Sequence, residues 1–265
     1  MKEKYTTIHV STDRRGVATL TISRPEKHNA LNDIVIAELS EAAKQIGADD
    51  SVRLVVLTAA GKSFCAGGDI NWFAENINKT REQRIVQSAS LAQMLHDLDS
   101  LPKPLIGRIN GSAFGGGVGM ISVCDLAVGL ETCKFGLTEV RLGLIPANIS
   151  PYVVRRLGGP NARATMLSGA LFDGRRANEI GLLTRAVAVG ELDATVEQVI
   201  AAHLEAAPGA VAETKKLIDY VISHTMEENR VYTAAALADA WEAEEGQLGI
   251  NTFLEKKQPP WRLGS

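Results

Sequence analysis

The 265-residue chain lacks the features that mark several classes of protein. Its three cysteines, Cys65, Cys124 and Cys133, are odd in number and have no CxxC spacing, so neither a disulfide framework nor a zinc site is expected. No apolar run reaches the roughly 20 residues that span a bilayer, and residues 1–5 lead into no signal-like apolar segment. The net charge of −3 offers no excess of positive charge for a polyanion. These absences predict a cytoplasmic globular protein without a membrane or nucleic-acid partner.

The motifs of several well-known enzyme classes are also incomplete. Gly61-Lys62-Ser63 looks like the end of a phosphate-binding P-loop, but Val56 stands where its first glycine is required. The glycines at 115–119 do not complete GxGxxG, and no GxSxG is present. The five histidines include no HExxH. We therefore expect no nucleotide-binding loop, no serine-hydrolase elbow and no metal.

The apolar periodicity predicts alternating strands and helices up to about residue 190. Strands are expected at 8–10, 17–22, 53–58, 105–109, 125–128 and 184–189, and helices at 33–46, 71–98, 120–123, 160–168 and 175–180. Asn32 is suited to cap the first of these helices and Gly47 to end it. From Glu191 on, strand signals stop and successive amphipathic helices are predicted. We expect an α/β core over 1–190 and a helical oligomerisation segment over 191–265.

Two glycine-rich turns follow apolar extended stretches. The first is Phe64-Cys65-Ala66-Gly67-Gly68-Asp69, and the second lies within Asn110–Met120, with glycine at 111, 115, 116, 117 and 119. Glycines let backbone N–H groups approach a ligand closely. The turns are therefore either ordinary tight turns or two halves of an oxyanion hole, each giving one N–H to a carbonyl oxygen. One carboxylate, Glu139, lies among apolar neighbours in the loop 135–146.

Five segments resemble the crotonase, or enoyl-CoA hydratase/isomerase, superfamily in their order and spacing over essentially the whole chain. They are 24–32, 63–70, 110–117, 135–146 and 253–257. The resemblance implies an α/β spiral of ββα units and a C-terminal helical segment that builds trimers, often paired into hexamers. Within the superfamily, residues 117–119 and 144–154 look most like bacterial methylglutaconyl-CoA hydratases of leucine catabolism.

The resemblance also implies roles for individual residues. The backbone N–H groups of Ala66 and Gly116 would hold the thioester oxygen, and Glu139 would move the proton. The substrate-binding set would be Lys27, His28, Ala30, Leu31, Gly68, Asp69, Ile70, Phe114, Gly119, Ala147 and Asn148, with Phe253 and Lys256 reaching the site from a neighbouring subunit. The bland alternative for the two lysines is ordinary solvation. Coenzyme A would be part of the substrate, so no separate cofactor is expected.

The chain departs from the family at one position. Family hydratases usually carry two glutamates; the later one matches Glu139, whereas Gly119 replaces the earlier one. One carboxylate can serve if it takes a proton from water and passes it to carbon. We expect the space beside Gly119 to hold part of the acyl group, or a water positioned by Asn148. The first hypothesis is an enoyl-CoA hydratase for a short or branched substrate such as methylglutaconyl-CoA. The alternatives are a Δ3,Δ2-enoyl-CoA isomerase and a non-catalytic CoA- or RNA-binding scaffold.

Overall fold

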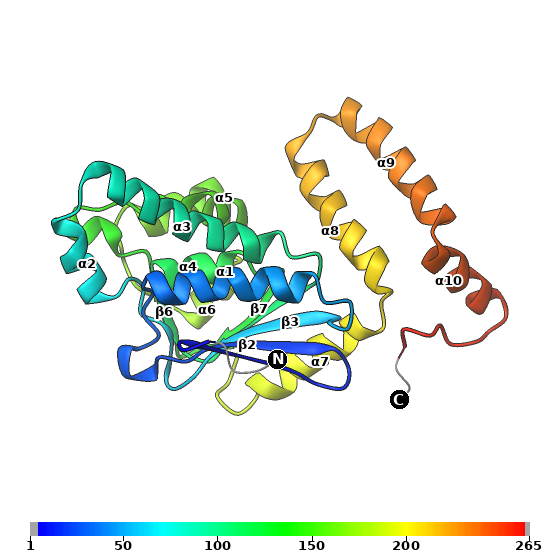
Figure 1. Ribbon diagram of the computed structural model, residues 1–265, viewed down its shortest axis with the longest axis horizontal. Coiled ribbons are helices and arrows are strands. Elements are labelled where there is room, and N and C mark those ends of the chain that lie inside the picture. The colour runs from blue at the N-terminus through cyan, green and yellow to red at the C-terminus, as the bar shows by residue number, and fades with distance from the viewer. Residues whose placement is uncertain (1–4, 263–265) are drawn as a thin grey trace.

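The computed structural model describes residues 5–262, which form two sheets flanked by helices and a helical arm that stands apart from them (Figure 1). Residues 1–4, where no targeting signal is predicted, and residues 263–265 lie outside the described part. None of the helices within 5–262 is long and apolar enough to cross a membrane.

The first sheet has six strands in the order β1-β2-β3-β5-β7-β10. β1 and β2 form the predicted antiparallel hairpin, and the strands from β2 onward pair in parallel. Every residue of β3 is buried, as expected for a strand covered on both faces. The bounds are β1 (Ile8–Thr12), β2 (Val17–Ile22), β3 (Leu54–Ala59), β5 (Leu105–Ile109), β7 (Leu126–Leu130) and β10 (Arg185–Val187).

The second sheet consists of short strands that the periodicity did not predict. Its order is β4 (Ser63–Cys65), β6 (Ser112–Phe114), β8 (Lys134–Gly136) and β9 (Phe172–Asp173). Strands of two or three residues are too short to show an alternating pattern. Each of β3, β5 and β7 in the first sheet is followed directly by a strand of the second. The chain therefore winds between the sheets in the spiral that the family resemblance implies.

Helices pack against both sheets. α1 (Asp33–Gly47) begins where Asn32 Oδ1 accepts a hydrogen bond of 3.0 Å from the Val35 N–H, as predicted. The helix expected over 71–98 is instead two helices, α2 (Ile70–Ile77) and α3 (Arg81–Asp99), because Thr80 caps a new start. α1 and α3 lie side by side (Figure 1). The others are α4 (Gly116–Ser122), α5 (Ser150–Met166), which is kinked at Gly158, and α6 (Gly174–Glu179).

The predicted change from strands to helices at residue 191 is confirmed, but one of the helices belongs to the core. α7 (Leu192–Leu204) buries Leu192, Val196, Val199 and Ile200 against strands of the first sheet. The arm therefore begins at α8 (Pro208–Ser223) and continues with α9 (Met226–Glu242) and α10 (Glu244–Leu254), which lie away from the sheets (Figure 1). An independent domain boundary at residue 190 stays a prediction.

Candidate active site

The two glycine turns lie against each other where β4 and β6 end. These strands are parallel neighbours, so their turns leave the same edge of the second sheet. Gly67 has φ +92° and Gly115 has φ +49°, conformations that favour glycine. A Cβ placed on Gly67 would lie 3.2 Å from the Phe114 carbonyl oxygen, and one on Gly115 would lie 3.9 Å from the Gly67 Cα. The sequence prediction that these turns could act on one ligand atom therefore has a geometric basis.

The hydrogen bonds of the first turn correct the predicted donor. The Ala66 N–H donates to the His28 carbonyl at 3.0 Å, so it is already used inside the protein. The Leu31 N–H donates to the Gly67 carbonyl at 2.7 Å, and the Asp69 N–H donates to the Leu31 carbonyl at 2.9 Å. Because the residues on either side of Gly68 make both of these bonds, the Gly68 N–H points away from Leu31. Within residues 5–262 it has no acceptor, and it replaces Ala66 as the available donor.

The second turn keeps the predicted donor. Gly116 is the first residue of α4, and the first N–H groups of a helix have no partner within the helix. A Cβ on Gly116 would lie 2.7 Å from Leu31 Cδ1, so the residue that bridges to Gly68 also packs against Gly116. Leu31 is buried, and it therefore contacts both turns from inside the protein.

The carboxyl group of Glu139 lies at the same turns. Glu139 begins a short 3₁₀ helix over 139–142, and its Oε1 is 2.9 Å from the point that a Cβ on Gly115 would occupy. Its Oε2 is buried and has no hydrogen-bond partner among the described residues. Burial raises the pKa of the Glu139 carboxyl above its usual value, because the charged form is poorly solvated there. A carboxyl in this state is suited to exchange a proton with a bound reactant.

The space predicted beside Gly119 is filled by another side chain. Gly119 is buried in α4, and a Cβ placed on it would overlap Cγ2 of Ile149 and lie 2.9 Å from the Ile149 Cβ. Leu95 Cδ2 closes the same region at 3.7 Å. The expectation that a water or part of the acyl group occupies this space is therefore wrong, and Gly119 is not a substrate contact here.

Asn148 is occupied with the protein itself. Its Oδ1 lies 3.0 Å from the Ser88 hydroxyl oxygen on α3 and accepts a hydrogen bond from it. Its Nδ2 lies 2.8 Å from the same Ser88 hydroxyl oxygen. The side chain therefore fixes the end of the 139–149 loop to α3. Ala147, the residue before it, is exposed.

Arg24 and Asn29, which the sequence analysis did not single out, shape the predicted CoA-binding loop. Arg24 Nη2 pairs with Asp69 Oδ2 at 2.9 Å, and Arg24 Nη1 donates to the Ala30 carbonyl at 2.5 Å. Asn29 is fully buried at φ +55°, and its amide donates to the carbonyls of Ala60 (2.8 Å) and Ser63 (2.7 Å). Asparagine tolerates this left-handed conformation, which was the signal available in the sequence. These contacts hold the loop against the turn that carries Gly68.

The remaining predicted contacts divide into exposed and buried side chains. Lys27, His28 and Ile70 are exposed beside the first turn, with His28 Nδ1 3.1 Å from the Ser63 hydroxyl. Ala30, Leu31 and Asp69 have buried side chains and would offer a ligand only backbone groups. Phe114 closes the end of β6, with its carbonyl against Gly67.

Phe253 and Lys256 do not reach this site within one chain. They lie at the end of α10, which contacts α8 and α9 in the arm, whereas the site lies between α2 and α4 on the other side of the molecule (Figure 1). The Phe253 side chain is 79% exposed. A role for these two residues at the site would require a second copy of the chain.

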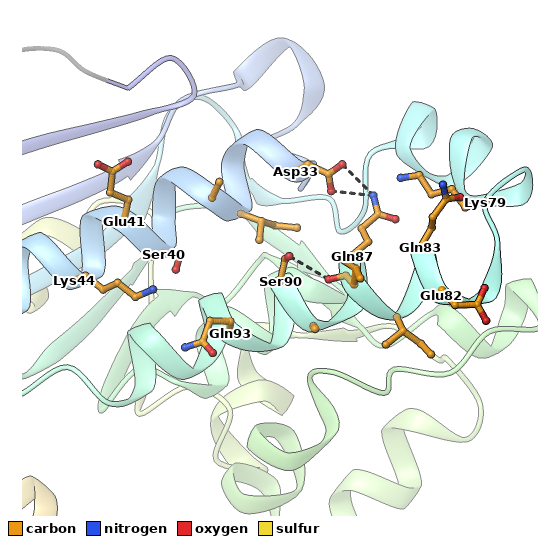
Figure 2. Close-up of a pocket in the computed structure, with 15 residues that line it drawn as sticks. Asp33, Ser40, Glu41, Lys44, Lys79, Glu82, Gln83, Gln87, Ser90 and Gln93 are labelled. Carbon is orange, nitrogen blue, oxygen red and sulfur yellow. Dashed lines mark hydrogen bonds between the residues drawn. The ribbon is translucent and has the colours of Figure 1, made fainter.

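A separate hollow of about 1230 Å³ runs between α1 and α3 (Figure 2). Figure 2 shows the Gln87 amide pointing at the Asp33 carboxylate, with hydrogen bonds of 2.9 and 3.1 Å. None of the residues that line it belongs to the predicted site. Within residues 5–262, no three potential metal-ligating side chains gather at one point, and the expected absence of a metal stays a prediction.

Comparisons with known proteins bear on the family and the fold. A family model described as enoyl-CoA hydratase/isomerase matches residues 12–263. The crystal structure of an enoyl-CoA hydratase from Shewanella pealeana superposes with a TM-score of 0.94 at 34% identity, over 98% of this chain and 97% of the other. Enoyl-CoA hydratase ACTT6 of Alternaria alternata is 35% identical over 93% of this chain and 81% of its own. Mevalonyl-coenzyme A hydratase sidH of Aspergillus fumigatus is 31% identical over 93% and 91%.

Proposed function

The chain belongs to the enoyl-CoA hydratase/isomerase family and has its α/β crotonase fold, and on that premise we propose that it adds water to, or removes it from, a short or branched enoyl-CoA thioester. The observation that carries this proposal is the buried Oε2 of Glu139, which has no hydrogen-bond partner within residues 5–262, beside two glycine turns with available N–H groups. That carboxyl also argues against a non-catalytic scaffold, because an unsatisfied buried acid is costly to maintain.

The reaction assigns one task to each group. The N–H groups of Gly68 and Gly116 donate to the thioester oxygen and stabilise the negative charge that develops on it. The Glu139 carboxylate takes a proton from water while the water oxygen bonds to the β-carbon, and the carbon–carbon double bond becomes an enolate. The protonated Glu139 then gives that proton to the α-carbon, so that one carboxyl completes the addition. In the reverse direction the same steps release water.

For the substrate, we propose an acyl group branched at the β-carbon, with methylglutaconyl-CoA as the first choice and leucine catabolism as its setting. A relative at 31% identity is named a mevalonyl-coenzyme A hydratase, and the mevalonyl group is branched at that carbon. The CoA moiety would lie along the 27–31 loop and the turn at 68–70, beside the exposed Lys27 and His28.

A Δ3,Δ2-enoyl-CoA isomerase is the second candidate, and one observation favours it. The space beside Gly119 is occupied by Ile149, so an apolar side chain stands where a second acid–base carboxylate would be needed. Shifting a double bond needs only removal of a proton from one carbon and its return to another.

We also propose that the chain works as a trimer or hexamer in the cytoplasm. The arm exposes large apolar side chains, among them Leu237, Trp241, Phe253 and Leu254, which a lone chain leaves uncovered. An assembled neighbour would bring Phe253 and Lys256 to the site. The three cysteines are buried free thiols, which suits a reducing compartment.

Incubation with a panel of enoyl-CoA thioesters in ¹⁸O-labelled water tests the proposal. Hydration places the label on the product and adds the mass of water, whereas isomerisation moves the double bond without either change. Label in a branched product supports the hydratase. A double-bond shift without label on every substrate would overturn it in favour of the isomerase, and no turnover at all would reject both.

A further inference from the structure

We propose that Ile149 determines the chemistry of the site, because it fills the position beside Gly119 and keeps water and polar groups away from that side of the reacting acyl group. This inference rests on the proposed function and assigns a specificity-determining role to a residue outside the catalytic set. It also means that Gly119 and Ile149 act as a matched pair, in which a side chain at one position excludes a side chain at the other.

The contact between the two residues is too close for any side chain at 119. A Cβ there would overlap Cγ2 of Ile149, and the Ile149 Cβ itself would lie 2.9 Å away. Packed interiors do not tolerate such distances without moving side chains or backbone. Gly119 and Ile149 are both buried, with Ile149 only 3% exposed, so the surroundings offer little room for Ile149 to retreat.

The pair lies close to the reacting groups. Gly119 follows Gly116 by three residues on α4, so both lie toward the same face of the helix, one turn apart. Ile149 ends the loop that Glu139 begins. One member of the pair is thus attached to the helix of the oxyanion donor, and the other to the loop of the proton carrier.

Ile149 is held in place from both sides. The preceding residue, Asn148, is bound through its amide to Ser88 of α3, and the Ile149 carbonyl accepts the Val153 N–H of α5 at 3.0 Å. Its β-branched side chain also has few accessible rotamers. The position and the rotamer of the Ile149 side chain are therefore fixed.

The apolar surface at Ile149 has a chemical consequence. The atoms that meet at Gly119 are those of Ile149 and Leu95, and an ordered water needs about two to four polar partners. Water can then reach the acyl group only where Glu139 holds it, and the substituent that faces Ile149 should be apolar. A second carboxylate at position 119 would be accepted only if Ile149 were shortened.

A double-mutant cycle tests the pairing. Gly119→Ala should lower the melting temperature and reduce turnover by at least about tenfold, since overpacking a core displaces its neighbours. Adding Ile149→Ala should recover part of both losses, so that the double variant lies closer to wild type than Gly119→Ala does. Ile180, at the end of α6, is buried to a similar extent, at 4%, but the side chains nearest to a Cβ on Gly119 are those of Ile149 and Leu95, so Gly119→Ala with Ile180→Ala should show no recovery.

A second arm tests the chemistry. Gly119→Glu with Ile149→Ala should incorporate ¹⁸O from water into crotonyl-CoA at least about tenfold faster than wild type or either single variant, because a second acid–base group becomes available. Additive effects in the first arm, an unchanged Gly119→Ala, or no gain of label in the second arm would overturn the inference. A wild type without turnover would reject the proposed function alone, since the melting-temperature cycle would still report on the pair.

Discussion

Replacement of Glu139 by glutamine removes the proton carrier while keeping its shape. A positioned proton-transfer group contributes about 10² to 10⁴-fold to rate, equivalent to about 3 to 5 kcal/mol of barrier. The amide cannot accept a proton from water, so we expect a loss of that size in turnover. Binding of a CoA thioester should survive, because the N–H donors of Gly68 and Gly116 and the 27–31 loop are unchanged.

The same variant has an expected pH signature. Burial raises the pKa of Glu139 above the usual 4.5, and hydration needs the ionised form, so wild-type turnover should rise with pH through the raised pKa. For stability, a raised pKa in the folded state means that folding is favoured below the unfolded value and loses that contribution as pH rises through the folded one. We therefore expect Glu139→Gln to be more stable than wild type at neutral pH and equal to it in acid.

Turnover of an enoyl-CoA panel and thermal unfolding at several pH values measure both effects. Glu179→Gln is a suitable control, because Glu179 is an exposed glutamate that pairs with Arg176, three residues away. Turnover of Glu139→Gln within a few-fold of wild type would remove Glu139 from the mechanism. A variant less stable than wild type at neutral pH would show that the buried carboxylate is better solvated than its surroundings indicate.

Three further outcomes are expected. Gly115→Ala should abolish most turnover, because its Cβ would meet Glu139 Oε1 at 2.9 Å, whereas Gly143→Ala also places a side chain at positive φ but with no described atom within 4 Å of its Cβ, and it should keep turnover in the same assay. Asp69→Asn should lower the free energy of unfolding by about 3–5 kcal/mol, since it breaks a buried ion pair. Burial opposes the ionisation of Asp69, but the hydrogen bond from Arg24 helps to hold the pKa of Asp69 below its usual value. Denaturant titration should therefore show the difference in unfolding free energy between wild type and Asp69→Asn shrinking as the pH falls through that pKa. Trp241→Glu in the arm should weaken assembly by sedimentation, and a wild type that sediments as a 28.4 kDa monomer would contradict the proposed oligomer.

Much of the first sheet was predictable because its strands carry the apolar signal themselves. β3 is buried along its whole length, and β2 alternates, so each could be found from a window of a few residues. The second sheet escaped because β4 and β6 have three residues each and take their stability from their neighbours. α7 shows a related limit: its amphipathic pattern predicts a helix, but no pattern says that its apolar face packs on Val17 and Val56 rather than on the arm.

At the site, the sequence shows which types of residue are present but not which contacts they make. The glycine runs and the lone carboxylate of Glu139 were visible in the sequence, because glycine and a charge among apolar residues are rare choices. Which N–H is available was not visible. Ala66 and Gly68 are two residues apart in one turn. The Ala66 N–H donates to the His28 carbonyl of the loop, whereas the bridge to Leu31 turns the Gly68 N–H away from that residue.

The group that fills the space beside Gly119 was also not visible in the sequence. A glycine where a larger side chain is expected predicts an empty space. Near the reacting groups, the sequence therefore predicts that a water or part of the substrate occupies it. Packing sets the opposite expectation, since protein interiors rarely leave a side-chain volume empty. The side chain that fills this one comes from Ile149, thirty residues later along the chain, and it is placed by the Asn148–Ser88 hydrogen bonds rather than by any local pattern. Gly119 and Ile149 therefore share one space in the core, and a substitution at either position has to be interpreted together with the other.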